Sequence, residues 1–432
     1  MTSSVKTDVD KFKEAGEEVQ KQGKKLIGNI ADLMKKSPEA QLVEIIILLM
    51  IALVVVIFVF WAYNLTSLQG RDCARLDKIY STQNDTIRPI GVFTRFPKIP
   101  GINYRPANIL FDAREGNGRV FSYYVKTAFN ACSPGNFSNS FVSICALRNN
   151  IQLGARCLDF EIYSIDLEPV VSTSSVSSNL ASSFFIKETF NYIKLRDVLL
   201  FIKYFALESA NGGAVNHTDP LFLHLRIMTG QRTTIDEIAN QLKDILGDSL
   251  LEPAYGMNNY NTSIRDLPVL QVCGKCIIMV NKNTTMSNDA TITSSNLWPL
   301  TNVFTGSENY RFYRFSTINN MSEDDQNDLA YYNKTNMSII VPDAGNQNMN
   351  FDSTIPLRLG CQFIAMNFQT FDSNLQTYFS IFGEIGHSFV LKPCSLRYIP
   401  RHVLVDTSEM PRGAGCDITL ENGEIVLSGG GI

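Results

Sequence analysis

The chain has 432 residues, of which 45% are hydrophobic, and a formal net charge of −4. This length and apolar content allow one large core or two to three ordinary domains. The negative net charge, with no basic run longer than two residues, argues against nucleic acid as a partner. The nine cysteines are an odd number and form no dense short-range framework, so their pairing stays open.

The N-terminal residues 1–37 are charged and carry apolar residues at a spacing that suits an amphipathic helix. Gly16, Gly23 and Gly28 would each weaken such a helix by about 1 kcal/mol. Two interpretations stay open. The segment is either an amphipathic helix that lies on a membrane or pairs with another helix, or a fraying cytosolic tail.

A membrane-spanning helix is predicted for residues 38–64. Positions 37–39 provide a serine N-cap, a first-turn proline and an acidic residue. The run from Ile45 to Tyr63 carries no charge, and at about 1.5 Å per residue it nearly crosses a hydrocarbon core of about 30 Å. Trp61 stands near its end as an interfacial anchor. Residues 45–63 therefore predict contact with a lipid bilayer, as a signal-anchor rather than a cleaved signal peptide.

The charges beside this helix predict its orientation. Lys35 and Lys36 precede it and favour a cytosolic N-terminus, although Arg71 and Arg75 follow it. The remainder would then be lumenal or exterior, on an endomembrane or a virion. Glycosylation sequons after the span agree with this orientation. The candidate glycosylation sites are Asn84, Asn136, Asn216, Asn261, Asn283, Asn320, Asn333 and Asn336.

Residues 65–117 contain several prolines and are predicted to be a stalk, after which strands and helices alternate. The predicted strands are 121–129, 155–163, 221–227 and 276–280. The predicted helices are 141–151, 195–206 and 234–246, the last opened by a capping box at Thr234 and closed at Gly247. This alternation favours an α/β fold with a parallel-stranded barrel.

Residues 283–300 lie in an Asn/Thr/Ser-rich stretch without periodicity and are predicted to link two barrel halves, 118–282 and 301–398. The C-terminal tail, 399–432, contains an alternating apolar pattern around an Asn-Gly pair. This pattern predicts a β-hairpin with a two-residue turn.

Two carboxylates, Asp159 and Glu161, lie two residues apart in a predicted strand and would project from the same face. Because they repel, such a pair usually requires a metal ion, an arginine or a shared proton. The alternative is that this strand face is solvated.

Three runs resemble eukaryotic phosphoinositide-specific phospholipase C. Residues 154–169 contain Arg-Cys-Leu-Asp-Phe-Glu-Ile-Tyr, which is similar to the family's Arg-Cys-Leu-Glu-Leu-Asp-x-Trp strand. Residues 360–370 read Gly-Cys-Gln-Phe-Ile-Ala-Met-Asn-Phe-Gln-Thr, and residues 386–393 read Gly-His-Ser-Phe-Val-Leu-Lys-Pro. Both look like runs in the second half of the family's barrel. The resemblance covers residues 118–398 and implies a (β/α)8 TIM barrel, with buried thiols at its two Cys matches.

The family's catalytic residues are not matched. Phe129 stands at one catalytic histidine position and Thr173 at the other, and neither side chain can transfer a proton near neutral pH. We therefore expect no catalytic residue, no bound calcium and no other cofactor. The remnant calcium-ligand positions are Asn130, Asp159 and Glu161, with Arg226 replacing a carboxylate.

The positions that bind phosphate and inositol in the family are replaced too. The matched residues are Met279, Asn281, Asn320, Ile339 and Val341. Of the four histidines, His224 lies on the same predicted strand as Arg226 and could face the barrel interior. A histidine in that place is more often hydrogen-bonded filler than a catalyst.

Arg226 could neutralise the repulsion between the two carboxylates, Asp159 and Glu161. An inward guanidinium would take the place of the calcium ion and match carboxylate geometry. An outward Arg226 in solvent is the alternative.

These patterns predict a membrane-anchored, catalytically inactive phospholipase C-like protein that acts as a structural or binding domain. A scaffold on a virion or organelle membrane is one such role, and the protein partners stay unknown. Two alternatives remain. One is a phosphodiesterase or lipase with a rebuilt active site, and the other is a receptor for lipid headgroups or glycans.

Overall fold

The structure is a computed structural model, and it describes residues 38–84, 118–175, 187–208, 214, 216–258, 263–282, 289–345, 348–383, 388–398, 417–421 and 424–428. The chain divides into two compact units, residues 1–67 and 68–432. The predicted amphipathic segment, residues 1–37, lies outside the described residues.

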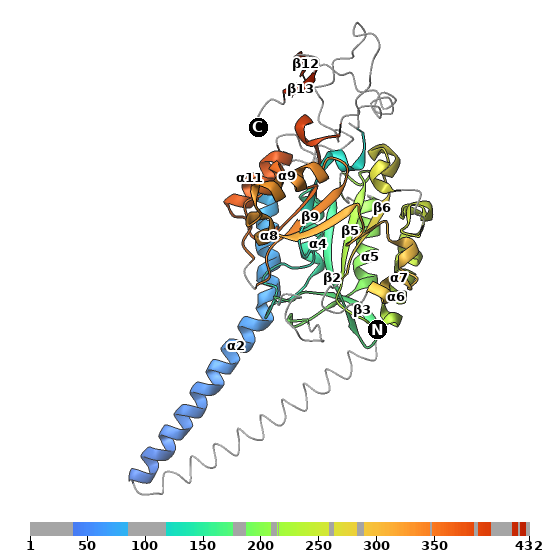
Figure 1. The fold of residues 1–432 in the computed structure, drawn as a ribbon. Helices are drawn as coiled ribbons and strands as arrows, with labels where there is room; N and C mark the ends of the chain where they lie inside the picture. Colours follow the sequence, from blue (N-terminus) through green and yellow to red (C-terminus); the bar gives the residue numbers. More distant parts are fainter. Residues whose placement is uncertain are drawn as a thin grey trace. The chain divides into compact units, whose positions relative to one another are not determined.

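One long helix, α2 (Pro38–Asn84), begins in the first unit (Figure 1). From Ile45 onward it is long and apolar enough to cross a membrane, and the side chains of its apolar part are exposed. A helix of this kind near the N-terminus is consistent with a single-pass anchor or a signal sequence.

The predicted stalk differs from the structure, because α2 continues without a break to Asn84. No proline occurs between residues 39 and 88, so no proline ends the helix earlier. Residues 68–84, here called the α2 extension, belong to the second unit. Residues 85–117 of the predicted stalk lie outside the described residues.

The α2 extension packs on the second unit through one face. Leu76 is 2% exposed and Tyr80 packs against the core. A disulfide joins Cys73 to Cys145 at a sequence separation of 72 residues, a pairing that the sequence left open. A loop of this length corresponds to about 4 kcal/mol of stabilisation in the chain-entropy description.

Eight parallel strands form a nearly closed barrel, which confirms the predicted fold class (Figure 1). In sheet order they run β7-β6-β5-β2-β1-β10-β9-β8. Among the described residues, β7 and β8 share no ladder, so the barrel has one open seam. The strands are β1 (Tyr123–Ala128), β2 (Cys157–Ile165), β5 (Leu221–Ile227), β6 (Cys276–Asn281), β7 (Val303–Phe304), β8 (Tyr310–Arg314), β9 (Met337–Val341) and β10 (Phe363–Met366).

Shorter strands extend the sheet. β3 (Glu168–Ser172) pairs antiparallel with β2 and with β4 (Ile193–Lys194), while β11 (Phe389–Leu391) pairs antiparallel with β1. The predicted hairpin is confirmed as β12 (Asp417–Glu421) and β13 (Glu424–Ser428). Its predicted Asn-Gly turn lies outside the described residues.

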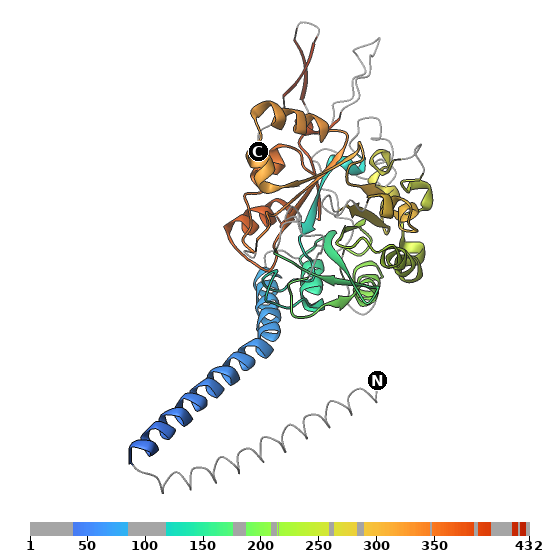
Figure 2. The ribbon, with the colours of Figure 1, turned by 60° about the horizontal axis from the view of Figure 1, so that its bottom comes forward.

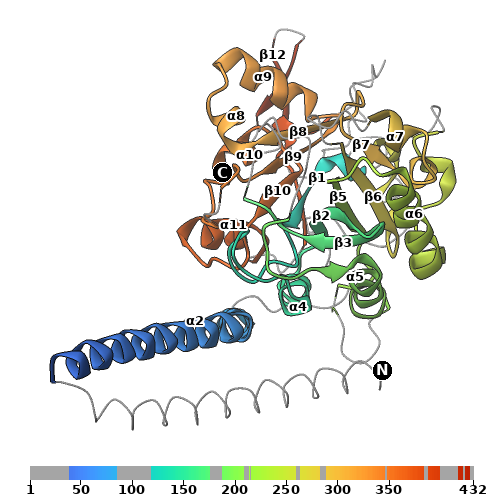
Figure 3. The ribbon, with the colours of Figure 1, turned by 90° about the horizontal axis from the view of Figure 1, so that it is seen from below.

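Helices surround the barrel strands, as the turned views show (Figures 2 and 3). They are α4 (Ile144–Gln152), α5 (Leu195–Phe201) with a π-helix (Ile202–Leu207), α6 (Arg232–Leu246), α7 (Asp289–Thr293), α8 (Phe315–Asn319), α9 (Glu323–Tyr332), α10 (Thr354–Arg358) and α11 (Ser373–Gly383). Short 3₁₀ helices lie at Val120–Ser122, Gly247–Ser249, Pro253–Tyr255, Ile264–Asp266, Val269–Val272, Trp298–Leu300 and Cys394–Leu396.

The core has two apolar layers, because alternate side chains of each strand point inward and outward. The inner cluster fills the barrel and includes Phe222, whose ring lies 5.0 Å from that of Phe363. The outer cluster packs the strands against the helices. Cys157 and Cys361 are buried, as the resemblance implied.

The predicted capping box is wrong. α6 begins at Arg232 with Gln231 as its N-cap, and not at Thr234. The Thr234 hydroxyl instead donates to the Leu167 carbonyl at 3.2 Å, so the turn after β2 uses it. The predicted end of the helix at Gly247 is confirmed. Gly247 is the C-cap of α6 and has a φ of 47°.

The predicted linker is irregular only in part. Residues 283–288 lie outside the described residues, but α7 and a 3₁₀ turn follow them. Ile292 and Leu297 are buried in the outer cluster, and the Trp298 ring lies 5.1 Å from that of Phe304. The apolar residues in this polar stretch are too few to show the spacing that predicts a helix.

Candidate functional site

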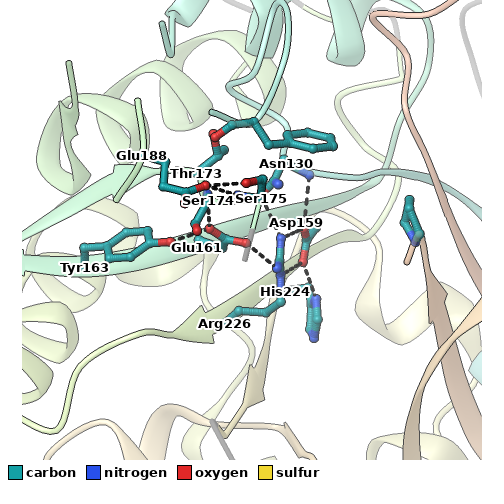
Figure 4. Close-up of polar contacts among 12 residues, drawn as sticks. Asn130, Asp159, Glu161, Tyr163, Thr173, Ser174, Ser175, Glu188, His224 and Arg226 are labelled. Carbon is teal, nitrogen blue, oxygen red and sulfur yellow. Dashed lines mark hydrogen bonds and ion pairs between the residues drawn. The ribbon is translucent and has the colours of Figure 1, made fainter. Parts of the chain in front are cut away.

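The register between β2 and β5 assembles the candidate site. The strands run parallel, with Asp159 opposite His224 and Glu161 opposite Arg226. All four side chains have the same parity as Cys157 and Phe222 of the inner cluster, so they point into the barrel. Figure 4 shows them converging.

The Arg226 guanidinium lies between the two carboxylates. Its Nε donates to Asp159 Oδ1 at 2.9 Å, and its Nη2 donates to Asp159 Oδ2 at 2.7 Å. Its Nη1 donates to Glu161 Oε1 at 2.6 Å, and Nη2 also donates to Asn130 Oδ1 at 2.7 Å. The inward orientation that the sequence suggested is therefore confirmed (Figure 4).

The remaining carboxylate oxygens also have partners. Asp159 accepts the backbone N–H of Asn130 at 3.0 Å and faces His224 Nδ1 at 2.7 Å. Glu161 Oε2 accepts the Tyr163 hydroxyl at 2.6 Å and the backbone N–H of Ser174 at 3.0 Å. Bidentate and charge-assisted bonds of this kind are the strong ones.

Burial and charge act in opposite directions on these groups. Burial favours the neutral acid of Asp159, but Arg226 and His224 outweigh it and hold the pKa of that carboxyl well below its usual range. Burial alone would lower the pKa of Arg226, but Asp159 and Glu161 raise it above its usual value. The pKa of Tyr163 is raised well above its usual value by burial and then by Glu161. The cluster is therefore held as ion pairs.

The remnant calcium-ligand positions do not fit a calcium ion. The carboxylate oxygens that would bind it accept hydrogen bonds from Arg226, and a second cation there would be repelled. Within the described part of the chain, no group of three or more His, Cys, Asp or Glu side chains could hold a metal.

Arg226→Glu is expected to rebuild a calcium site, because it would place a third carboxylate beside Asp159 and Glu161. Calcium should then raise the melting temperature of this variant, since a ligand that binds only the folded state stabilises it. Thermal unfolding with calcium or with a chelator measures this effect. Equal calcium responses in Arg226→Glu and the unmodified chain would contradict it.

The two positions matched to catalytic histidines carry no proton-transfer group. The Phe129 ring lies under the Arg226 guanidinium at 4.6 Å and makes an edge contact with Phe137 at 5.5 Å. The Thr173 hydroxyl donates to the Phe137 carbonyl at 2.9 Å and is buried. Phe137 thus packs on the ring that lies against Arg226.

The positions matched to the phosphate and inositol contacts are mostly apolar filling. Met279, Ile339 and Val341 are buried in the inner cluster. Asn281 is also buried, at the end of β6. Asn320 is exposed and follows α8, so it lies on no barrel strand.

His224 faces the barrel interior and is 0% exposed. Its ring stacks on that of Phe312 at 6.0 Å, and its Nε2 has no partner among the described residues. His217 is half-buried beside the Ala214 carbonyl. The other two histidines, His387 and His402, lie outside the described residues.

Sequence reasoning missed several residues of the site. Tyr163 follows the carboxylates at the same two-residue spacing, so alternation could have found it. Arg314 ends β8, and burial followed by repulsion from Arg226 lowers its pKa to about 10. Phe137 and Ser174 come from loops, whose positions no local pattern predicts.

The candidate glycosylation sites differ in exposure. Asn136 and Asn320 are exposed. Asn333 is 0% exposed, and its side-chain amide donates to the Leu359 carbonyl at 2.8 Å. The side-chain amides of Asn216 and Asn336 donate to Ser388 Oγ and the Tyr332 carbonyl. The side chains of Asn84, Asn261 and Asn283 lie outside the described residues.

Comparisons with known proteins show what this chain is similar to. The profile of the phosphatidylinositol-specific phospholipase C Y domain matches residues 307–395. The crystal structure of S. officinalis PLC21 matches with 19% identity and a TM-score of 0.50, over 66% of this chain and 38% of that chain. L. pealei PLC21 matches with 18% identity and a TM-score of 0.49, over the same shares.

This chain thus spans less than half the length of those two proteins. No curated protein matches it. The Y-domain match covers the second half of the predicted barrel, and the structural match covers the fold. The second unit contains a barrel like that of phosphatidylinositol-specific phospholipase C, and residues 307–395 in its second half are similar to that family's Y domain.

Proposed function

We propose that this chain is a membrane-anchored, catalytically inactive phospholipase C-like protein whose barrel acts as a structural or binding domain. The observation that carries the proposal is the Arg226 guanidinium, bonded to Asp159 and Glu161 at the matched calcium position. An arginine there supplies neither a Lewis acid nor a vacant coordination position.

The loss of proton transfer supports the same conclusion. Phe129 carries no acid or base, and the Thr173 hydroxyl is bonded to a carbonyl. General acid and base groups each contribute on the order of 10² to 10⁴ in rate. Met279 and Ile339 provide no cation for a phosphate.

A rebuilt active site is the rival proposal, and it would need a base, an acid and a phosphate-binding cation at one place. His224 is the nearest base, but it is enclosed between Asp159 and aromatic rings. An interior filled by apolar side chains favours a barrel kept for its shape, such as a scaffold on a virion or organelle membrane.

We expect no hydrolysis of phosphoinositides above background. The purified full-length chain would be incubated with phosphoinositide vesicles and calcium, and released inositol phosphate would be measured. An active phospholipase C in the same assay is the positive control. Calcium-dependent release that His224→Ala or Arg226→Ala abolishes would instead support the rebuilt enzyme.

The disulfide supports a lumenal or exterior barrel. Cys73 and Cys145 both follow the apolar run, and disulfides persist in oxidising compartments. Lys35 and Lys36 on the other side favour a cytosolic N-terminus. We therefore propose a single-pass protein with its barrel outside the cytosol.

Glycans are expected on Asn136 and Asn320 but not on Asn333, because only the first two are exposed in the fold. Mass spectrometry after enzymatic glycan release, on protein from a glycosylating eukaryotic host, measures occupancy at each site. Asn136→Gln and Asn320→Gln should each remove one mass increment, with Asn333→Gln as the matched control. Cleavage of the barrel by protease from the cytosolic side of sealed membranes would overturn this orientation.

A further inference from the structure

The α2 extension contacts a loop that reaches the barrel mouth. We call residues 133–140 the mouth loop. The Arg75 side chain donates from Nη2 to the Pro134 carbonyl at 2.9 Å, and it also pairs with Asp72 on its own helix at 3.3 Å. Asp72 is itself buried. The helix and the loop are therefore joined by a hydrogen bond from an arginine whose side chain is 49% exposed, beside the buried Asp72.

The contact is close at Gly135. A Cβ on Gly135 would lie 2.5 Å from Asp72 Oδ2 and 2.9 Å from Ser140 Oγ, so one of these side chains would have to move to admit it. The Gly135 carbonyl also accepts from Ser133 Oγ at 3.1 Å. The mouth loop is thus fitted against the α2 extension by shape as well as by hydrogen bonds.

The mouth loop also contacts residues beside the ion-pair site through Phe137. Phe137 is 2% exposed and packs edge-on against Phe129, and its carbonyl accepts the Thr173 hydroxyl. Phe129 in turn lies against Arg226. One loop therefore contacts both the α2 extension and the Phe129 ring that lies against Arg226.

The covalent tie of the α2 extension lies beside these contacts. Cys73 is one residue from Asp72 and two from Arg75, and its disulfide partner, Cys145, is in the first turn of α4. Arg75 makes a single hydrogen bond to the mouth loop. We therefore expect the disulfide to be the main restraint that holds the α2 extension on the barrel.

We propose that the α2 extension is a latch that keeps Phe137 over the barrel mouth, and that the Cys73–Cys145 disulfide locks it. This inference is independent of whether the barrel is catalytic. In the reduced chain the extension separates from Pro134 and Gly135, the mouth loop loosens, and Phe137 leaves Phe129.

The unlocking step requires a dithiol as reductant. One of its thiolates attacks a sulfur of the disulfide, forming a mixed disulfide and releasing the other cysteine as a thiolate, which takes up a proton. The second thiol of the reductant then attacks the mixed disulfide. The products are two protein thiols and the oxidised dithiol, so two electrons and two hydrogens pass to the protein.

Hydrogen exchange of the full-length chain in detergent micelles tests the latch, with and without dithiothreitol. The Asn139 N–H, which bonds the Glu188 carbonyl at 3.0 Å, is a reporter within the mouth loop. Reduction, and separately the Cys73→Ser/Cys145→Ser variant, should speed exchange in residues 133–140 at least tenfold, while β5 keeps its rate. Unchanged exchange in residues 133–140 after reduction would overturn the proposal.

If reduction also speeds exchange in β5, the whole barrel is destabilised, and a second variant is needed to test the latch. Arg75→Ala leaves the disulfide intact and removes the bond to the Pro134 carbonyl together with the ion pair to Asp72. Faster exchange in residues 133–140 than in the Asp77→Ala control, an exposed position on the same helix, supports the latch. Equal exchange in these two variants overturns it.

Discussion

Arg226→Ala is expected to lower the free energy of unfolding by about 3–5 kcal/mol, because removing one partner of a buried ion pair leaves uncompensated charge. In this chain two buried carboxylates, Asp159 and Glu161, would lose the guanidinium that is bonded to both of them. Asn130 would lose a hydrogen bond as well. Denaturant unfolding of the full-length chain measures the change.

A matched control separates this effect from the general loss of an arginine. Arg232 pairs with Asp236 at 2.8 Å, but its side chain is 46% exposed. Arg232→Ala should therefore cost about 0–1 kcal/mol. If Arg226→Ala is as stable as Arg232→Ala, the guanidinium is not the built-in cation that the fold requires.

The barrel and part of the site could be predicted from the sequence because both follow strand alternation. Asp159 and Glu161 share a face by their spacing, and Arg226 was matched to a position that meets them once β2 and β5 pair. The inward orientation of Arg226 is therefore a consequence of register, which the apolar alternation of β5 sets.

The cover of the site could not be predicted in this way. Phe137 reaches Phe129 through a loop, and its position depends on contacts with Thr173 and the α2 extension, which are distant in sequence. The disulfide likewise joins two residues that are distant in sequence, Cys73 and Cys145. Such contacts are set by tertiary packing and leave no local period in the sequence.

The start of α6 could not be predicted from the capping box at Thr234. The hydroxyl had a competing acceptor in the Leu167 carbonyl, and a sequence motif does not show competing partners.

A second large effect is expected on the outer side of β1, where Lys126 is buried and pairs with no carboxylate in the part of the chain that the structure describes. Its Nζ donates to the Leu153 carbonyl at 3.2 Å and lies 5.3 and 5.2 Å from the rings of Phe379 and Phe382. Burial lowers the pKa of Lys126 from its usual 10.5 to about 7. Lys392, also buried, has its pKa lowered to about 7.

The sign of the pH dependence follows from these values. Between about pH 7 and pH 10.5 the unfolded chain holds a proton on Lys126 that the folded chain lacks, so stability rises with pH through this window. Below about pH 7 both states are protonated and the full penalty of burying the charge applies. Each pKa unit corresponds to about 1.4 kcal/mol, so the penalty is on the order of 4–5 kcal/mol.

Lys126→Met should therefore stabilise the chain at pH 7 and reduce the rise in stability between pH 7 and pH 10, leaving the part due to Lys392. Methionine keeps the apolar stem against Phe379 and Phe382 while removing the charge. Denaturant unfolding at several pH values measures the slope, and Lys243→Met, at an exposed position on α6, is the control that should leave it unchanged. If Lys126→Met and Lys243→Met show the same slope as the unmodified chain, Lys126 is protonated in the folded state throughout this range, and its aromatic and carbonyl surroundings must solvate the charge.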